Sequence, residues 1–275
     1  MINTYMKKLT FFFLVYLSSN IVFGQVDTVE VYSKSMHRSI PNLIITPKDY
    51  ILQNEELPVL YLLHGAGGYF SNWMFRVPEI EQYASDYNII IVCPDGDKTS
   101  WYIDSPIDSS SQYESYITKE LVPAIDRNYR TIKHKNSRAI TGLSMGGHGA
   151  FYLAFKHQDI WGAAGSMSGG VDIIPFAEEW NLDELLGAYP EYKKNWEQHS
   201  VINLTHLLNG DLKIVFDCGK EDFFAEVNQS LHEKMNAKNI PHDYTVRPGK
   251  HNWKYWRNSI KHHLVYFDDF FNSEN

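Results

Sequence analysis

The sequence contains little cysteine, no excess of basic charge and no long hydrophobic segment. Its two cysteines, Cys93 and Cys218, are too few for a disulfide-rich scaffold and lack the spacing of a zinc site, although one disulfide between them stays open. Acidic residues outnumber basic ones by 33 to 25 and no basic cluster occurs, so nucleic acid is not an expected partner. No apolar run reaches the roughly 20 residues that a membrane-spanning helix needs.

The first 24 residues have the pattern of a secretory signal peptide. Lys7 and Lys8 precede a short apolar run at 9–17, and the small residue Gly24 ends the segment. We therefore expect cleavage after Gly24 and a secreted or periplasmic protein without membrane attachment, whose formal net charge changes from −8 to −10 when the two lysines are removed. A buried N-terminal helix is the alternative interpretation.

The length of the segment 25–275 fits one large α/β domain. Apolar runs alternate with helical patterns, which predicts a mostly parallel sheet covered by helices on both faces. The expected strands are 29–32 and 43–46, forming an antiparallel hairpin, and then 59–63, 89–92, 137–141, 161–168, 212–216 and 242–246. The expected helices are 112–128 (with a kink site at Pro123), 149–156 and 253–270. The looser stretch 171–210 is expected to form a small helical excursion over the carboxyl ends of the strands.

The most informative motif is Gly142-Leu143-Ser144-Met145-Gly146, which fits the pattern Gly-x-Ser-x-Gly. Such a motif places a nucleophilic serine on a sharp turn between a strand and a helix, and the glycines two positions on either side allow the helix to pack closely on the strand. A β-prone run precedes the motif and a helical pattern follows it. This context favours Ser144 as a nucleophile over a glycine-rich turn with only a packing role.

A nucleophilic serine needs a histidine that accepts its proton and a carboxylate that orients the histidine. In α/β-hydrolases the carboxylate follows the serine in the chain and the histidine comes last. Asp217, Glu221 and Asp222 all follow the strand expected at 212–216, and Asp222 is preferred because it lies further into the loop. His251 is the preferred base, because it lies in a turn between the last strand and the last helix.

The other histidines receive different interpretations. His262 and His263 fall within the last helix and are expected to face solvent, whereas His148 follows Ser144 by one helical turn and is expected to be structural or to line the site. Trp73, Trp101 and Tyr102 follow strand ends, so they are candidates for stacking on a sugar or aromatic ring of a substrate, with ordinary packing as the alternative.

Acyl transfer also needs hydrogen-bond donors for the oxyanion of the transition state. One donor is expected to be the backbone amide of Met145, directly after the nucleophile. The second should come from the glycine-rich loop after the strand 59–63, and the amide of Ala66 is the preferred candidate.

On these motifs the chain resembles the esterase D family of α/β-hydrolases over nearly all of the segment 25–275. This group is similar to S-formylglutathione hydrolases, feruloyl and acetyl-xylan esterases, tributyrin esterases, mycolyltransferases and siderophore esterases. The resemblance rests on Leu62-Leu63-His64-Gly65, Pro94-Asp95-Gly96, Gly142-Leu143-Ser144-Met145-Gly146-Gly147 with Gly149-Ala150, Asp217-Cys218-Gly219 with Asp222-Phe223, and Gly249-Lys250-His251 with Trp253. It implies an α/β-hydrolase fold with Ser144, Asp222 and His251 as catalytic residues, Ala66 and Met145 as oxyanion donors, and neither a metal nor an organic cofactor.

The resemblance, together with the signal peptide, predicts a secreted serine carboxylesterase. Its expected substrates are short-chain acyl or feruloyl esters on plant polysaccharide or oligosaccharides. A periplasmic siderophore-ester hydrolase is an alternative with the same chemistry. A non-catalytic glycan-binding module is an alternative of another class, which the presence of all three catalytic side chains disfavours. The sequence does not determine the oligomeric state.

Overall fold

The computed structural model describes residues 26–273, so the predicted signal peptide lies outside the described residues. The centre of the molecule is one eight-stranded sheet with the strand order β1-β2-β4-β3-β5-β6-β7-β8. β1 pairs antiparallel with β2 and β2 antiparallel with β4, while all the following pairs are parallel. The predicted leading hairpin and mostly parallel sheet are both confirmed.

The central strands are short and buried, as expected for a sheet that is covered on both faces. β3 (Val59–Leu63), β4 (Ile90–Pro94), β5 (Arg138–Gly142) and β6 (Ala163–Met167) are buried at every position. The remaining strands are β1 (Val26–Ser33), β2 (Arg38–Ile45), β7 (Lys213–Gly219) and β8 (Asp243–Arg247).

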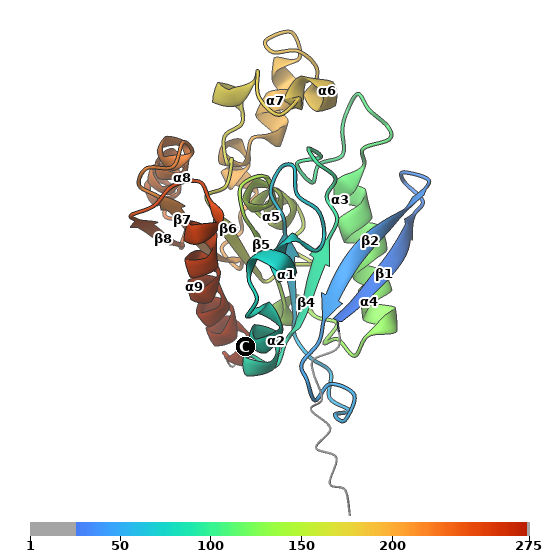
Figure 1. Cartoon of the computed structure of the whole chain (residues 1–275). Coiled ribbons are helices and arrows are strands. Elements are labelled where there is room, and N and C mark those ends of the chain that lie inside the picture. Colours follow the sequence, from blue (N-terminus) through green and yellow to red (C-terminus); the bar gives the residue numbers. More distant parts are fainter. Residues whose placement is uncertain (1–25, 274–275) are drawn as a thin grey trace, which may run out of the picture.

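Two apolar clusters hold the helices on opposite faces of the sheet (Figure 1). On one face pack α5 (Met145–Lys156), the segment from α3 (Tyr113–Ser115) to α4 (Val122–Asn128), and α8 (Ala225–Ala237). On the other face pack α1 (Asn72–Arg76), α2 (Ile80–Asp86) and α9 (Trp253–Asn272). The layers are those of a three-layer α/β domain, and they bring the loops after β3, β5, β7 and β8 to one end of the sheet.

The helix expected at 112–128 contains a wide turn. A π-helical segment, Tyr116–Leu121, separates α3 from α4, and the amide of Val122 donates to the carbonyl of Ile117, five residues back. Pro123 follows directly. A proline lacks an N–H and its ring clashes with the carbonyl four residues earlier, which explains a departure from α-helical geometry at this point.

The excursion between β6 and β7 stands above the sheet at the top of Figure 1. It contains α6 (Leu182–Leu186), α7 (Lys193–His199) and three 3₁₀ turns at Ile174–Phe176, Val201–Asn203 and Thr205–Leu207. A further 3₁₀ turn, Lys135–Ser137, precedes β5. Trp196 of α7 is fully buried, so the excursion has an apolar anchor of its own.

The two cysteines do not form a disulfide. Cys93 lies on β4 and Cys218 on β7, with β3, β5 and β6 between those strands, and both thiols are free and buried. Burial raises the pKa of each thiol far above its ordinary value, so both side chains behave as small apolar core residues.

Helix α9 is amphipathic and buries one stripe against the sheet. Trp256, Ile260 and Phe267 belong to that stripe. His262 is exposed, as predicted, but the neighbouring His263 is fully buried. The prediction that His263 faces solvent is wrong, because His263 lies on the buried stripe that continues at Ile260 and Phe267.

Candidate active site

Ser144 lies on the sharp turn between β5 and α5. Its backbone has φ 57° and ψ −120°, a left-handed conformation that costs a non-glycine residue energy and is held by the surrounding packing. A Cβ on Gly142 would lie 2.5 Å from the carbonyl oxygen of Gly146, and one on Gly146 would lie 2.5 Å from the carbonyl oxygen of His64. Both glycines are therefore required by close backbone contact around the serine.

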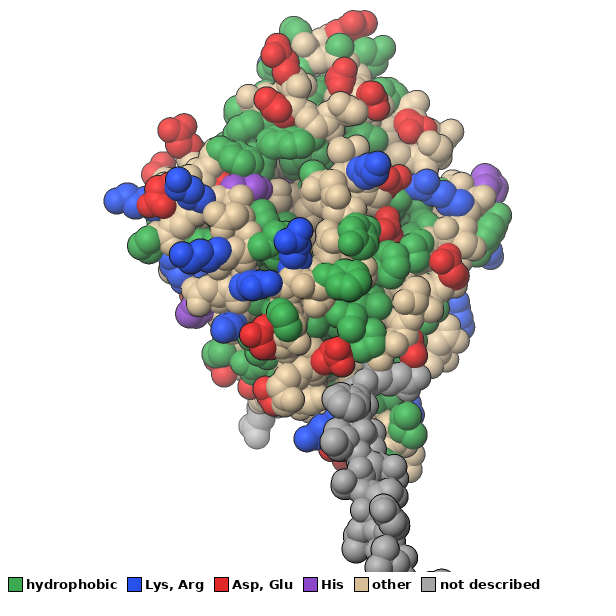
Figure 2. All heavy atoms as spheres, in the orientation of Figure 1, with side chains coloured by type: hydrophobic (Ala, Val, Ile, Leu, Met, Phe, Trp, Pro, Cys, Tyr) green, Lys and Arg blue, Asp and Glu red, His purple; other side chains and the backbone are tan. Residues whose placement is uncertain are grey.

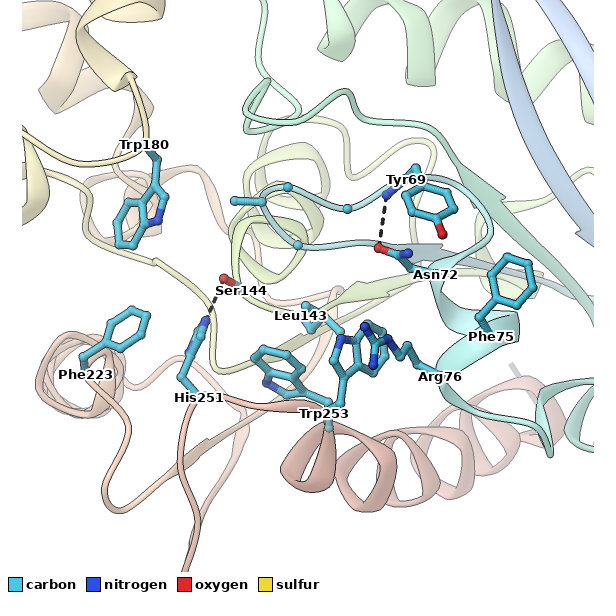
Figure 3. Close-up of a pocket in the computed structure, with 15 residues that line it drawn as sticks. Tyr69, Asn72, Phe75, Arg76, Leu143, Ser144, Trp180, Phe223, His251 and Trp253 are labelled. Carbon is cyan, nitrogen blue, oxygen red and sulfur yellow. Dashed lines mark hydrogen bonds between the residues drawn. The ribbon is translucent and has the colours of Figure 1, made fainter.

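The Ser144 side chain is hydrogen-bonded to His251, which in turn is hydrogen-bonded to Asp222. The Ser144 Oγ lies 2.9 Å from His251 Nε2, and His251 Nδ1 lies 2.9 Å and 3.0 Å from the two carboxylate oxygens of Asp222 (Figure 3 shows the first contact). The Asp222 carboxylate is fully buried, while the His251 side chain is 14% exposed. Three residues predicted from separate loops thus form one continuous relay.

Local structure fixes both partners of the serine. Asp222 lies in the loop between β7 and α8, where its Oδ1 also accepts a hydrogen bond from the amide of Phe224 at 2.9 Å. His251 lies between β8 and α9, directly before Asn252, whose side chain accepts from the Tyr255 amide at the start of α9. The loops therefore hold the carboxylate and the imidazole before any substrate arrives.

Aromatic rings surround the imidazole of His251. The centroids of Phe223, Phe224 and Trp256 lie 4.2, 5.4 and 4.9 Å from the centroid of the His251 ring. Such a shell excludes water from most of the ring and restricts its rotation, which favours the orientation toward Ser144.

The two predicted oxyanion donors lie at the same end of the sheet as Ser144. Met145 is the first residue of α5, and Ala66 lies in the loop after β3. Neither amide N–H donates a hydrogen bond within the described part of the chain, so both are free for a ligand. Ala66 and Ser144 line one pocket.

A buried histidine and a buried tyrosine hold the loop that carries Ala66. His64 Nδ1 lies 2.9 Å from the carbonyl of Gly65, and its Nε2 accepts the Gly96 amide at 2.8 Å. The Tyr102 hydroxyl accepts from the His64 amide and donates to the His64 carbonyl. Burial lowers the pKa of His64. The neutral ring matches its two contacts, with Nδ1 donating and Nε2 accepting.

Asp217, the alternative acid, has a different environment from Asp222. Its carboxylate is buried, with Oδ2 hydrogen-bonded to the Ser259 hydroxyl, 3.2 Å from His263 Nε2 and 3.0 Å from an Arg247 guanidinium nitrogen. His263 Nδ1 lies 2.9 Å from the Thr141 hydroxyl on β5. This network ties β7 and β5 to α9, and it leaves Asp222 as the carboxylate that contacts His251.

The three candidates for stacking on substrate are buried, as is His148, the candidate for lining the site, and none of the four lines the pocket at Ser144. Trp73 packs in the apolar cluster between the sheet and helices α1, α2 and α9, and its indole N–H donates to the Leu63 carbonyl at 3.0 Å. Trp101 is 1% exposed and Tyr102 is fully buried. This corrects the expectation of substrate stacking, because the loops after the strands turn these rings into the core.

His148 is likewise a packing residue. Its Nδ1 lies 3.2 Å from the Trp101 carbonyl and its Nε2 lies 2.8 Å from the His199 carbonyl. Burial lowers the pKa of His148 to about 4, against the opposing effect of the two carbonyls. The side chain therefore links α5 to the loop at 101 and to the end of α7, away from substrate.

An open pocket of about 580 Å³ surrounds Ser144 and His251. In Figure 3, Trp180 and Phe223 lie on one side of the reactive pair, while Tyr69, Phe75 and Arg76 lie on the other. The full lining comprises Gly65, Ala66, Gly67, Gly68, Tyr69, Asn72, Phe75, Arg76, Leu143, Ser144, Trp180, Phe223, His251, Trp253 and Trp256. The sequence did not single out Asn72, Phe75 or Arg76 as site residues, because the five-residue helix α1 is too short to give a periodic pattern.

The described residues contain neither a metal-binding cluster nor a membrane-spanning helix. Within residues 26–273, no group of three or more His, Cys, Asp or Glu side chains is arranged to hold a metal ion. Over the same range, no helix combines the length and hydropathy needed to cross a bilayer.

Comparison with known proteins links this geometry to esterases. The family model described as "Putative esterase" matches residues 33–267. An esterase of Mycobacterium tuberculosis is 36% identical over 235 residues, which cover 76% of this chain but 51% of that protein, so the chain spans about half the length of this relative. An acetyl esterase of Caldicellulosiruptor saccharolyticus is 23% identical over 261 residues, covering 84% of this chain and 94% of that one.

A solved structure has the same architecture. The structure of a ferulic acid esterase superposes with a TM-score of 0.79 at 26% sequence identity, covering 91% of this chain and 100% of that chain. The similarity therefore covers nearly the whole chain.

Proposed function

The chain belongs to the esterase family whose model it matches, and from that premise we propose that it is a serine carboxylesterase acting through Ser144, His251 and Asp222. The observation that carries the proposal is the continuous hydrogen-bonded relay from the Ser144 hydroxyl through the His251 ring to the Asp222 carboxylate. A packing role for the serine would need neither the relay nor the strained backbone at Ser144.

The geometry suggests a two-step reaction. His251 accepts the proton of Ser144 as its Oγ attacks the ester carbonyl, and Asp222 stabilises the resulting imidazolium. The amides of Ala66 and Met145 stabilise the oxyanion, a contribution worth about 3 kcal/mol for each donor in comparable enzymes. His251 then protonates the leaving alcohol. Water, activated by the same ring, releases the acid from the acyl-enzyme.

We propose short-chain acyl or feruloyl esters, on plant polysaccharide or its oligosaccharides, as the substrates. The acetyl esterase and the ferulic acid esterase among the similar proteins support this class. The pocket supports it too, because it is open and has aromatic side chains on both sides of Ser144, which suits a sugar or phenyl ring. From the signal-peptide pattern of residues 1–24 we also propose that the protein is exported to the periplasm or the medium.

The test is a panel of esters: p-nitrophenyl acetate, butyrate and octanoate, methyl ferulate and acetylated xylan. We expect turnover of the acetate and butyrate, and faster turnover of ferulate or xylan if the polysaccharide assignment is right. Ser144→Ala should remove activity on the whole panel while keeping the circular dichroism spectrum and Tm of the wild type. Retention of most activity in Ser144→Ala would contradict the assignment of the nucleophile.

A further inference from the structure

The pocket at Ser144 has one positively charged side chain and no acidic one among its described lining residues. Arg76, at the end of α1, is the only Lys or Arg that lines it, and no Asp or Glu does. The protein as a whole carries a formal net charge of −8, so an ordinary stretch of its surface contains more acids than bases. The charge of the pocket is thus opposite in sign to that of the molecule.

Arg76 has no ionic partner in the described part of the chain. Arg38, Arg138 and Arg247 each form an ion pair with an aspartate, whereas no salt bridge involves Arg76. The guanidinium lies 6.0 Å from the ring centroid of Trp253, which also lines the pocket. The guanidinium N–H groups of Arg76 donate no hydrogen bond within the described part of the chain, so they are available to an acceptor from outside.

Asn72 provides a second donor beside Arg76. The two residues lie at positions i and i+4 of α1 and therefore on the same face of the helix. The Asn72 Oδ1 accepts the Tyr69 amide at 3.1 Å, which leaves the side-chain NH₂ group as the free end (Figure 3). Both residues line the pocket, so a guanidinium and an amide NH₂ group are presented to the same space.

The apolar neighbours of this face are exposed. Phe75 is 68% and Tyr69 is 46% exposed, and both line the pocket next to Arg76. In Figure 2, Lys and Arg side chains gather over α1 and the N-terminal part of α9. Aromatic side chains beside an unpaired arginine are suited to a ligand with a ring and a negative charge.

We propose that Arg76 and Asn72 form a subsite for an anionic group, with a carboxylate as the best planar match, so that the natural substrate is an ester that carries a negative charge away from the scissile bond. This inference deepens the proposed function and rests on it. Among sugar esters, the charge would be that of a uronic acid unit. The carboxylate can belong to the acyl part or to the alcohol part of the ester, and the test treats the two separately.

The experiment compares matched anionic and neutral esters. For the acyl part, the pair is monophenyl adipate and phenyl hexanoate; for the alcohol part, it is 4-acetoxybenzoate and 4-acetoxybenzamide. In at least one pair, Arg76→Gln should lower kcat/KM for the anionic member about tenfold or more, mainly through KM, and change that of the neutral member less than twofold. Arg76→Lys should restore part of the loss, and added salt should reduce the preference of the wild type for the anion.

Lys213→Gln is the matched control. Lys213 is exposed at the first position of β7, at the opposite end of the sheet from Ser144, and does not line the pocket, so the same charge change should leave all four esters within twofold of the wild type. The subsite would be overturned if Arg76→Gln changed the anionic and neutral members of both pairs equally, or changed neither. A wild-type protein inactive on all four esters would instead contradict the proposed function itself.

Discussion

At the scale of single residues, the two buried aspartates at the end of β7 have different environments. Asp222 accepts a hydrogen bond from His251, whereas Asp217 is surrounded by Arg247, Ser259 and His263. Sequence reasoning could prefer Asp222 because it lies deeper in the loop. It could not show which groups bind Asp217, because two of them, Ser259 and His263, lie on α9, 42 and 46 residues later in the chain.

We expect Asp222→Asn to fold normally and to lose about 10³- to 10⁴-fold in kcat on p-nitrophenyl acetate. The amide can donate to His251 Nδ1 and so stabilise the tautomer that cannot accept the Ser144 proton. Steady-state kinetics on protein of confirmed Tm is the measurement. The exposed neighbour Glu221 offers the control, and Glu221→Gln should stay within twofold of the wild type. A loss of less than tenfold in Asp222→Asn would show that another carboxylate orients the base.

At the scale of elements, continuous apolar runs located the strands well. The run 59–63 coincides with β3. A strand that is buried on both faces is apolar at every position, so the bounds of the apolar run are also the bounds of the strand. The esterase D resemblance, which rested on strand–loop motifs of this kind, is confirmed by the family match over 33–267.

Other elements were missed for different physical reasons. Helix α8 carries Val227, Leu231 and Met235 at intervals of four residues. This apolar pattern indicates a helix, but the predicted helices did not include it. Helices α1 and α2 have five and seven residues, too few for a period to emerge. The position of Arg76 in the pocket follows from the packing of α1 beside α9, which no local pattern encodes.

The close packing of the strand–turn–helix element at Ser144 also predicts what happens when Gly142 gains one methyl group. In Gly142→Ala the new Cβ would lie 2.5 Å from the Gly146 carbonyl oxygen and 2.7 Å from the Leu63 Cβ, so backbone must move. We expect a loss of about 1–3 kcal/mol in the free energy of unfolding, together with a fall in kcat as the serine shifts. Urea denaturation and ester hydrolysis measure the two effects.

Gly210→Ala is the comparison for that variant. Gly210 has φ +93° with open space around its Cβ position, so only backbone strain of about 1 kcal/mol should result, with activity unchanged. Wild-type activity in Gly142→Ala would mean that the turn is less tightly packed than the structure indicates.

At the scale of the whole molecule, buried carboxylates should govern stability in acid. Burial opposes ionisation of Asp217, but the hydrogen bond and charge of His263, with Ser259 and Arg247, outweigh it and lower the Asp217 pKa. The same competition at Glu114, where burial is outweighed by His157 and Lys156, lowers the pKa to about 2. A carboxylate with a depressed folded pKa stabilises the protein above its unfolded pKa of about 4, and that stability is lost as pH falls through the folded value.

We therefore expect Asp217→Asn to lose about 3–5 kcal/mol of unfolding free energy at pH 7, because Arg247 and His263 lose a buried partner. The difference from the wild type should shrink as the pH falls from about 5 through the unfolded pKa of about 4 toward the lowered folded pKa, because the unfolded chain takes up a proton there that the folded Asp217 does not. Urea denaturation across this pH range is the measurement. Asp211, whose carboxylate is 68% exposed, gives the control, and Asp211→Asn should change stability by less than about 0.5 kcal/mol. A difference that grows toward acid pH would contradict the ionised state of Asp217.

The central claim is that Ser144 becomes covalently acylated during turnover. The most direct measurement is to mix the enzyme with p-nitrophenyl acetate, quench with acid within the first turnover, digest, and locate the acetyl group by peptide mass spectrometry. Acetylation of Ser144 in the wild type, absent from Ser144→Ala and accumulating in His251→Ala more slowly than in the wild type, is the predicted result. Continued hydrolysis with Ser144 unmodified, or with the acetyl group on another residue, would contradict it.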